Sequence, residues 1–331
     1  MDSIPGGGKL KKFKIFCLVL LAFLTTSCGQ KEEVINIPTA ATSGNLYPLG
    51  AALANLYNDK IPGIKACNQA SNGGLDNLHL MERKEVQLTF GVSNIVYDAY
   101  MGQGLFQGHA NKDLRVIAGL YYNPNQIVVR SDRGIEGLED LKGHSFAPGS
   151  HGSTTETECR NHLGVLGLDP DRDLRAQYLG FTEAGEEIRN GSLDGTWIMA
   201  GTPTAAVTEL MTTSPVKILS LDPAYLARIQ KDYPWYAAYT IPRGTYPKQD
   251  QDIHTTAIKM LMYTDKDLDD QVVYQMCRVF WENIQDLQKT IPSLKGIGVE
   301  EALEDISDLP VHPGAMKYYR EVSPQATHWE E

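Results

Sequence analysis

The chain has 331 residues, of which 42% are hydrophobic and 21% are charged, and its formal net charge is −11. This composition is ordinary for a globular protein, and the length is large for one hydrophobic core but comfortable for two domains. An acidic chain repels phosphate backbones, which argues against nucleic-acid binding.

The first residues have the pattern of a secretory signal peptide. Four lysines between residues 9 and 14 precede the apolar run Ile15–Phe23, and the small polar residues Thr25–Ser27 follow. The apolar run is shorter than the roughly 20 residues that a membrane-spanning helix needs. We expect residues 1–27 to be removed. With four lysines and one aspartate they carry a net charge of +3, so the rest of the chain carries −11 − 3 = −14.

Cys28 stands where a bacterial lipoprotein signal carries its lipidated cysteine. The segment resembles such a lipobox, although Thr25 occupies a place that is usually aliphatic. We expect Cys28 to be diacylated and residues 28–33 to form a tether. The protein would then be extracytoplasmic, in the periplasm or on the outer face of the cytoplasmic membrane, and held only by its lipid anchor. Simple secretion with a free Cys28 is the alternative.

The remaining cysteines and the histidines do not form metal-binding patterns. Cys67, Cys159 and Cys277 lack C-x-x-C spacing, and the histidines lack H-x-H or HExxH spacing. We therefore expect no metal and no cofactor. The three cysteines are expected to be buried or partly buried small apolar residues, while their pairing stays open.

Strands and helices alternate from Val34 onward. The predicted strands are Val34–Pro38, Ile64–Ala70 and Val86–Val92, and the predicted helices are Leu46–Asn58, Leu75–Arg83 and Ile95–Met101. This alternation predicts βα units on a largely parallel sheet.

The pattern then begins again in a second set of elements. Strands are predicted at Leu114–Tyr121, Gln126–Arg130, Ser145–Ala147, Gln177–Leu179, Gly195–Met199 and Val216–Leu221, and helices at Gly137–Lys142, Thr154–Val165, Thr182–Asn190 and Ala205–Thr212. The breaker Asn123-Pro124-Asn125 separates the first two strands. The aromatic-rich stretch Tyr233–Pro247, a strand at His254–Thr264 and helices at Leu268–Leu287 and Ala315–Glu321 complete the chain.

These elements predict an α/β fold with two lobes. We expect lobe 1 to contain residues 34–124 and 240–331, and lobe 2 to contain residues 125–239. Two chain crossings would form a hinge, with an interdomain cleft between the lobes. Clefts at the carboxyl ends of strands are where α/β proteins bind ligands.

Several motifs in order along the chain resemble those of one family. They are Thr42–Gly50, Gly73–Leu78, Ser93–Tyr100, Gly149–Glu156, Ala200–Pro203 and, most specifically, Leu309–Glu321 with the sequence LPVHPGAMKYYRE. Together they resemble the TAXI family, the solute receptors of tripartite ATP-independent periplasmic (TRAP) transporters. The resemblance implies a type II periplasmic-binding-protein-like fold and a small organic-acid ligand such as glutamate or a related carboxylate. It also implies delivery of that ligand to the membrane subunits of a TRAP transporter.

The predicted site consists of loops that lead from a strand into a helix. The free N–H groups of helix starts can hold a carboxylate without a positive side chain, and hydroxyls, amides and glycines there permit close contact. The predicted ligand-binding residues are Thr42, Ser43, Gly44, Tyr47, Asn72, Gly73, Ser93, Asn94, Tyr97, Ser150, His151, Ser153, Thr154, Gly201, Pro203 and Thr204.

Most of these residues also have a purely structural interpretation. Ser153 and Glu156 match the S-x-x-E capping box, and Ser93-Asn94 could cap a helix. Asn72 belongs to a turn signal, and the two tyrosines are at helical spacing typical of core residues. His151 replaces what is often a small residue in the family and could give pH-dependent ligand contact.

These observations predict reversible binding by hinge closure in a monomer. A ligand-binding sensor subunit for a receptor kinase, with the same fold, is the alternative, and the sequence does not separate the two. We do not expect an enzyme, because G-x-S-x-G, a cysteine nucleophile with a base, and a phosphate loop are all missing from the sequence.

Overall fold

The computed structural model describes residue 1 and residues 32–323. The predicted signal peptide beyond Met1, and Cys28, lie outside the described residues. One compact unit begins at Val34. Among the described residues, no helix is both long enough and apolar enough to cross a bilayer.

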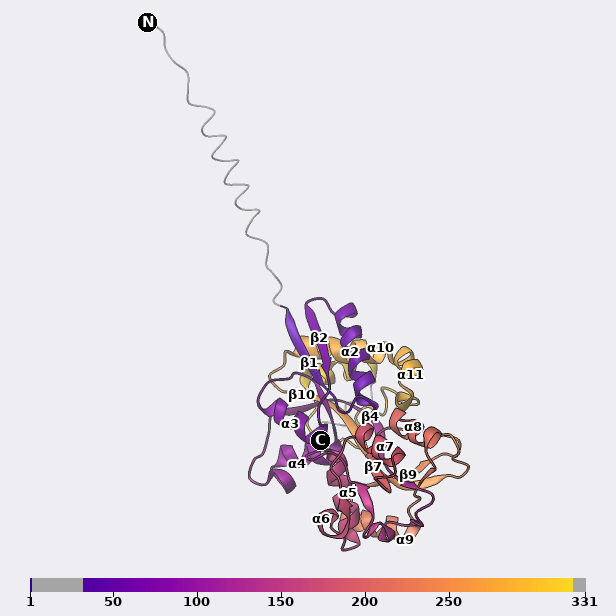
Figure 1. The fold of residues 1–331 in the computed structure, drawn as a ribbon. Coiled ribbons are helices and arrows are strands. Elements are labelled where there is room, and N and C mark those ends of the chain that lie inside the picture. The colour runs from indigo at the N-terminus through magenta and orange to yellow at the C-terminus, as the bar shows by residue number, and fades with distance from the viewer. Residues whose placement is uncertain (2–31, 324–331) are drawn as a thin grey trace. The chain divides into compact units, whose positions relative to one another are not determined.

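The first part of the fold agrees closely with the predicted elements (Figure 1). Its strands are β1 (Glu33–Pro38), β2 (Ile64–Gln69) and β3 (Thr89–Val92), and its helices are α2 (Leu46–Lys60), α3 (Gly74–Glu82), α4 (Ser93–Met101) and the 3-10 helix η1 (Gly104–Phe106). Helical spacing at Leu49, Leu53 and Leu56 predicts α2. In the structure Leu49 and Leu53 are fully buried together with Tyr57, while Leu56 is half-buried.

The second part is built from shorter elements around one long strand. They are β4 (Leu114–Arg130), η2 (Glu139–Leu141), β5 (Ser145–Ala147), α5 (Thr154–Val165), α6 (Pro170–Asp173), β6 (Arg175–Ala176), α7 (Phe181–Arg189), β7 (Gly195–Met199), α8 (Ala205–Thr213), β8 (Val216–Ile218), α9 (Pro223–Asp232) and β9 (Ala237–Ile241). The chain ends with β10 (Ile253–Asp265), α10 (Asp270–Glu282), α11 (Ile284–Thr290), η3 (Pro292–Leu294) and α12 (Pro313–Val322).

The main sheet is mixed rather than largely parallel. Its strand order is β3-β10-β4-β7-β5-β6, with β8 paired to β4 and β9 paired to β10, while β1 and β2 form a separate two-stranded sheet. Only the pairs of β5 with β6 and with β7 are parallel among the pairings described within the main sheet. The prediction of a largely parallel sheet was wrong because β10 returns from distant sequence and inserts antiparallel between β3 and β4.

Two long strands, β4 and β10, connect the two ends of this sheet. Residues 114–124 of β4 pair with β10, and residues 125–130 pair with β7 or β8. Likewise, β10 pairs with β9 up to Ala257 and with β3 and β4 beyond it. The predicted break at Pro124 is therefore wrong. Proline is tolerated because it stands where one ladder ends and the next begins.

The buried side chains form two clusters. The larger one contains residues from β1 to α12, and the smaller one joins β7, α7, α8 and β8 to Ile241, Tyr246 and Ile253. The predicted return to lobe 1 at residue 240 stays a prediction. In the structure, Ile241, Tyr246 and Ile253 belong to the same buried cluster as Val128 and Ile198.

Some local predictions were wrong. Residues 177–179 form no strand, residues 139–141 form a 3-10 turn within the predicted helix 137–142, and Asn283 interrupts the predicted long helix. Helix α9 was missed, although Asp222 caps it by accepting a bond from Tyr225 N and Pro223 is its first residue. Cys67 is exposed, and its Sγ lies 2.9 Å from Asn36 Oδ1, whereas Cys159 and Cys277 are buried; all three are free thiols.

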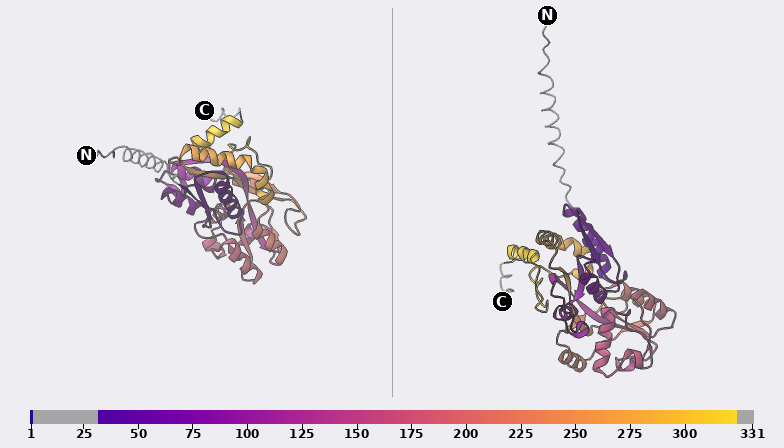
Figure 2. Two further views of the ribbon diagram at one scale, coloured as in Figure 1. Left: turned by 90° about the horizontal axis from the view of Figure 1, so that it is seen from above. Right: turned by 90° about the vertical axis from the view of Figure 1, so that its left-hand side faces the viewer.

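Helix α12 begins at the most specific motif of the sequence. His312 Nδ1 accepts a hydrogen bond from Gly314 N at 3.1 Å, and His312 Nε2 lies 3.0 Å from Leu268 O. A β-carbon at Gly314 would overlap Asp270 O, so α12 packs on α10 with backbone against backbone. Figure 2 shows the yellow α12 at the edge of the molecule beside the orange helices. The motif therefore has a structural role in docking α12.

Candidate functional site

A cavity of about 500 Å³ lies where several strand–helix loops meet. We call it the main cavity. Its walls come from the loops before α2, α3, α5 and α7, and from Tyr121 and Asn123 on β4 and Met260 on β10. Its volume falls within the usual range of small-molecule sites.

Half of the sixteen predicted ligand-binding residues line the main cavity. They are Thr42, Gly44, Asn72, Gly73, Ser150, Ser153, Thr154 and Gly201. The other half, which lie elsewhere, are Ser43, Tyr47, Ser93, Asn94, Tyr97, His151, Pro203 and Thr204. Loops were therefore identified better than individual side chains.

Ser43 and Thr204 contact each other beside the cavity. Ser43 O accepts hydrogen bonds from Ala206 N and Thr204 Oγ1, both at 3.3 Å, and Ser43 Oγ accepts one from Thr182 Oγ1 at 3.1 Å. Asn45 Nδ2 donates to Pro203 O at 3.0 Å. These bonds join the loop before α2 to the starts of α7 and α8, so Ser43, Pro203 and Thr204 hold the two walls together.

Four other predicted residues belong to helices α4 and α2 and do not line the main cavity. Helix α4 begins at Ser93 with Val92 as its N-cap, so Ser93 and Asn94 lie within the helix and the predicted cap at Ser93-Asn94 is wrong. Ser93 lines a separate cavity. Tyr97 packs against the core, and Tyr47 is in the first turn of α2, where its carbonyl accepts a bond from Asn68 Nδ2 at 3.2 Å.

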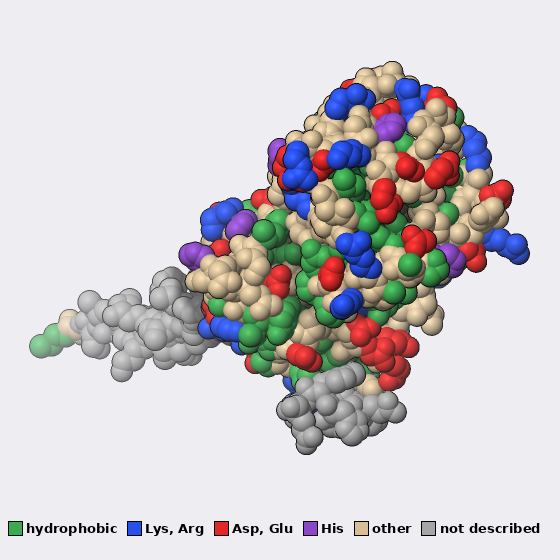
Figure 3. All heavy atoms as spheres, turned by 90° about the horizontal axis from the view of Figure 1, so that it is seen from below, with side chains coloured by type: hydrophobic (Ala, Val, Ile, Leu, Met, Phe, Trp, Pro, Cys, Tyr) green, Lys and Arg blue, Asp and Glu red, His purple; other side chains and the backbone are tan. Residues whose placement is uncertain are grey.

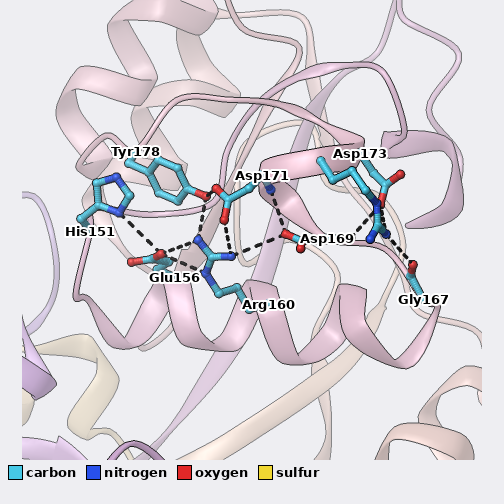
Figure 4. Close-up of polar contacts among 9 residues, drawn as sticks. His151, Glu156, Arg160, Gly167, Asp169, Asp171, Asp173 and Tyr178 are labelled. Atoms are coloured by element: carbon cyan, nitrogen blue, oxygen red, sulfur yellow. Dashed lines mark hydrogen bonds and ion pairs between the residues drawn. The ribbon is translucent and has the colours of Figure 1, made fainter.

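His151 belongs to a surface network behind the cavity wall (Figure 4). Its ring stacks on Tyr178, with centroids 3.7 Å apart, and its Nδ1 lies 3.6 Å from Glu156 Oε1. Arg160 donates to Glu156 and to Tyr178 Oη, at 2.8 and 2.7 Å. His151 therefore supports Tyr178, which does line the cavity, from outside.

Helix N-termini converge on the main cavity. The N-cap residues of α2, α3, α4, α5 and α7, which are Asn45, Gly73, Val92, Ser153 and Gly180, all line it. Only α5 among them has a side-chain cap, in which Ser153 Oγ accepts from Glu156 N at 3.1 Å. The predicted cap at Ser153 is confirmed, while Glu156 Oε2 accepts from Gly152 N instead of from Ser153 N. The other helices have first-turn N–H groups that no side-chain cap satisfies.

The lining mixes apolar and polar side chains, and none of the described residues adds a cationic one. Among the described residues, no lysine, arginine or histidine lines the main cavity, and Glu183 is its acidic member. Asn45 and Asn123 are more than nine-tenths buried, and the Oδ1 atom of each has no hydrogen-bond partner. Because Asn45 Nδ2 is already bonded to Pro203 O, its Oδ1 is a free acceptor. The cavity thus combines N–H donors at helix starts with a few acceptors.

The sequence analysis missed two groups of cavity residues. Tyr121 and Asn123 sit inside β4, where alternating strand residues give no local sign of a site. Tyr178–Glu183 were missed because residues 177–179 were predicted as a strand. Gly180 directly before α7 was the signal that could have identified this loop, as at the other helix starts.

A buried carboxyl group lies close to the main cavity on α5. Glu158 is fully buried, and its Oε2 accepts a bond from Asn125 Nδ2 at 3.2 Å, whereas its Oε1 has no partner. Burial raises the pKa of Glu158 to about 7, against the opposing effects of Tyr236 and Asn125. His162, one turn along α5, bonds to Thr256 Oγ1 at 2.8 Å, and burial lowers its pKa to about 3. This polar network joins α5 to both long strands.

One cluster of carboxylates lies outside the cavity. Asp113, Asp265 and Asp267 place oxygen atoms within 4.8 Å of one another. Lys84 and Lys266 already neutralise them, with Lys84 Nζ 2.5 Å from Asp265 and Lys266 Nζ 2.8 Å from Asp113. The cluster is therefore satisfied as a surface ion-pair network.

Charges of both signs are interspersed over the face drawn in Figure 3, with hydrophobic side chains between them. This face therefore provides no large field of one sign that would steer an anion toward the protein.

The chain is similar to a known protein family and to several solved structures. The NMT1-like family matches residues 37–322. The periplasmic binding protein BugD is similar over 89% of this chain and 95% of its own, with a TM-score of 0.54 and 13% identity. The match to the aliphatic sulphonate binding protein SsuA from Escherichia coli covers 90% of this chain and 77% of that protein, with a TM-score of 0.43 and 15% identity. The match to the alkanesulfonate-binding protein SsuA from Xanthomonas axonopodis pv. citri, bound to MOPS, covers 89% of this chain and 93% of that protein, with a TM-score of 0.47 and 14% identity.

The similarity to BugD agrees with the predicted fold class, an α/β fold of the periplasmic-binding-protein type. The family match extends from β1 to α12 and so includes the whole described fold apart from its first and last few residues. The chain therefore belongs to the NMT1-like family.

Proposed function

We propose that the protein is an extracytoplasmic solute-binding protein that captures a small organic acid in the main cavity. The observation that supports this most strongly is the convergence of five helix N-termini on a cavity that no cationic side chain lines within residues 32–323. Partial positive charge and free N–H groups at helix starts attract a carboxylate. No catalytic step is required of this arrangement, and we expect the ligand to be released unchanged.

The hydrogen-bond acceptors of the main cavity that lack donors narrow the chemical class of the expected ligand. Asn45 Oδ1 and Asn123 Oδ1 lack donors, and the Glu183 carboxylate lines the same cavity. A buried acceptor without a donor is costly, so a ligand that supplies N–H or O–H groups there gains affinity. A glutamate-like amino acid or a hydroxy acid meets both requirements, because it has carboxylate oxygens and donor groups.

Release requires the cavity to open. We propose that β4 and β10 form the hinge at the points where each exchanges its partners, near Pro124 and Ala257. The bonds of Ser43 and Asn45 to the starts of α7 and α8 would then break as the walls separate. Such hinge closure about two connecting segments is a common way to enclose a ligand.

We further propose that the receptor is of the TAXI type and delivers its ligand to TRAP membrane subunits. The sequence motifs from Thr42–Gly50 to Leu309–Glu321 support this finer assignment. Diacylation of Cys28 would hold the protein at the membrane surface, where the transporter lies.

Thermal unfolding of the purified protein with a panel of acids tests the function. Four- and five-carbon dicarboxylates, hydroxy acids and amino acids are compared with the corresponding neutral amides. A ligand present at 100 times its Kd stabilises the fold by about 2.7 kcal/mol, which raises Tm by a few degrees. We expect at least one acid, and not its amide, to raise Tm and to be recovered unchanged by mass spectrometry. A panel without any shift, and no acid co-purifying with the native protein, would contradict the proposal.

A further inference from the structure

A second cavity of about 290 Å³ lies beside the same two long strands. It contains Lys259 of β10 and Gly119 of β4, together with Ser293 and Lys295 from the segment around η3. Tyr121 lines both this cavity and the main cavity. None of these groups except Tyr121 belongs to the site described above.

Lys259 is a buried cation without a counter-ion. The residue is only 7% exposed, and among the described residues no carboxylate oxygen lies within 4.0 Å of its Nζ. Its Nζ lies 5.2 Å from the ring centroid of Tyr122, its neighbour across the strand pair. A lysine is rarely buried unless it is paired, because removing its charge from water is costly.

Two neighbouring hydroxyl groups in the same cavity make no hydrogen bond of ordinary length. Tyr121 is 5% exposed and Ser293 is 7% exposed, and burial raises the pKa of Tyr121 while the nearby Ser293 hydroxyl acts against this rise. Gly119 leaves room for the lysine, since a β-carbon there would lie 3.0 Å from Lys259 Cε and 2.9 Å from Ala302 O. The cavity therefore gathers the buried ammonium group of Lys259 and two neighbouring hydroxyls, while the second lysine of its lining, Lys295, is exposed.

The acidic residues nearby are at the rim. Glu301 and Glu304 line the cavity as exposed residues, and Glu301 Oε2 accepts a bond from Gly298 N at 3.2 Å. Asp305 is held by the hydroxyl of Tyr122. Burial lowers the pKa of Lys259, while the charges of Asp305, Glu304 and Glu301 act in the opposite direction. These carboxylates therefore balance part of the charge at a distance but leave the ammonium unbonded.

We propose that this second cavity is a binding site for a small monocarboxylate, with Lys259 as its charged partner. The two oxygens of one carboxylate can accept bonds from the ammonium group and from the hydroxyls of Tyr121 and Ser293, which satisfies all three. A single carboxylate fits better than a dicarboxylate, because a second negative charge would face Glu301 and Glu304 at the rim. This site is separate from the proposed organic-acid site and stands independently of it.

Calorimetric titration with sodium acetate at pH 7 tests the assignment. We expect wild-type protein to bind acetate and Lys259→Met to bind it at least tenfold more weakly, because a hydrogen bond to a charged group is lost together with the charge. Ser293→Ala should weaken binding by a smaller factor. Lys65→Met is the control, since Lys65 is an exposed lysine on β2. Sodium sulfate in a parallel titration should bind more weakly than acetate, because its second negative charge would face Glu301 and Glu304. Sulfate binding as tight as that of acetate would contradict the assignment to a monocarboxylate.

Thermal unfolding separates this proposal from a purely structural role. Without acetate, Lys259→Met should unfold at the same temperature as wild type or higher, because a buried unpaired charge is removed. With acetate, Tm should rise for wild type and for Lys65→Met but not for Lys259→Met. Equal acetate binding by wild type and Lys259→Met would place the acetate elsewhere and overturn the proposal. Absence of acetate binding to wild type would also overturn it. The function proposed for the main cavity is tested separately, by the thermal screen with the panel of acids.

Discussion

Glu158 shows how a single buried residue can make the stability of this protein depend on pH. Its carboxyl projects from helix α5, where one oxygen accepts a hydrogen bond from Asn125 of β4 and the other has no partner. The cost of burying the charged form favours the protonated form, and the pKa rises to about 7. In the unfolded chain the same group ionises near pH 4.5.

The expected result is a pH-dependent difference between Glu158→Gln and wild type. Glu158 contributes stability below about pH 4.5, and this is lost as pH rises to about 7, because only the unfolded chain releases its proton in that window. Glutamine, which resembles the protonated acid, shows no such loss. The free energy of unfolding of the variant relative to wild type should therefore increase by about 3 kcal/mol from pH 4 to pH 8.

Denaturant unfolding across this pH range measures the effect. His162 has the opposite dependence, since its lowered pKa removes stability as pH falls below about 6.5, but it titrates in both proteins and cancels in the difference. Glu186→Gln, at an exposed position on α7, is the control and should give a difference that does not change with pH. A flat difference for Glu158→Gln would show that the buried carboxyl keeps its ordinary pKa.

At the scale of the element, the starts of several helices form the main cavity. Gly74, at the start of α3, lies against the start of α5. A β-carbon on Gly74 would overlap Thr154 Oγ1 at the start of α5. Gly74→Ala should therefore hold the walls apart and weaken binding of the organic acid at least tenfold, which is about 1.4 kcal/mol. Titration of the acid found in the thermal screen measures this.

The matched control is Gly164→Ala on α5. A β-carbon at Gly164 meets open space, so this variant should bind normally and gain up to about 1 kcal/mol in stability from the higher helix propensity of alanine. Unchanged affinity in Gly74→Ala would show that the two helix starts do not approach when ligand is bound.

Elements with strong local signals could be predicted from the sequence alone. Helix α5 and strand β7 begin and end where predicted, because Ser153 caps the helix and a short apolar run between turn signals marks the strand. The direction of the sheet could not be predicted, because β10 pairs with β4 across more than a hundred residues. For the same reason Pro124 was interpreted as a break, since its partner strands are distant in sequence.

In the candidate site, too, residues with a local sequence signal could be predicted, and residues that depend on distant strand pairing could not. Loop residues before helices, such as Thr42 and Ser150, could be predicted to line a cavity because the chemistry of helix starts is local. Tyr121 and Asn123 could not, because only the pairing of β4 brings them to the cavity. Lys259 was also missed, since nothing in an alternating strand indicates that a lysine will be buried.

At the scale of the whole molecule, the closed arrangement depends on few bonds. Ser43, Asn45 and the starts of α7 and α8 make the polar contacts that join the walls beside the main cavity. Hydrogen bonds of this kind contribute about 1 kcal/mol each, so we expect the proposed closure to be only weakly favoured without ligand. A bound acid that contacts both walls would shift the population toward the closed state.

Locking this contact tests whether opening is needed for release. Ser43 Oγ and Thr182 Oγ1 lie 3.1 Å apart, so cysteines at both positions are close enough for a disulfide to form with a small adjustment. The double variant is made with Cys67→Ser, since Cys67 is the exposed thiol among the three cysteines that the structure describes. Protein loaded with the acid and then oxidised should release it at least tenfold more slowly than the reduced form, and reduction should restore the rate. The two single-cysteine variants should release normally under both conditions. Equally fast release from the oxidised double variant would mean that the ligand leaves without separation of the walls, and the proposed hinge in β4 and β10 would have no role in exchange.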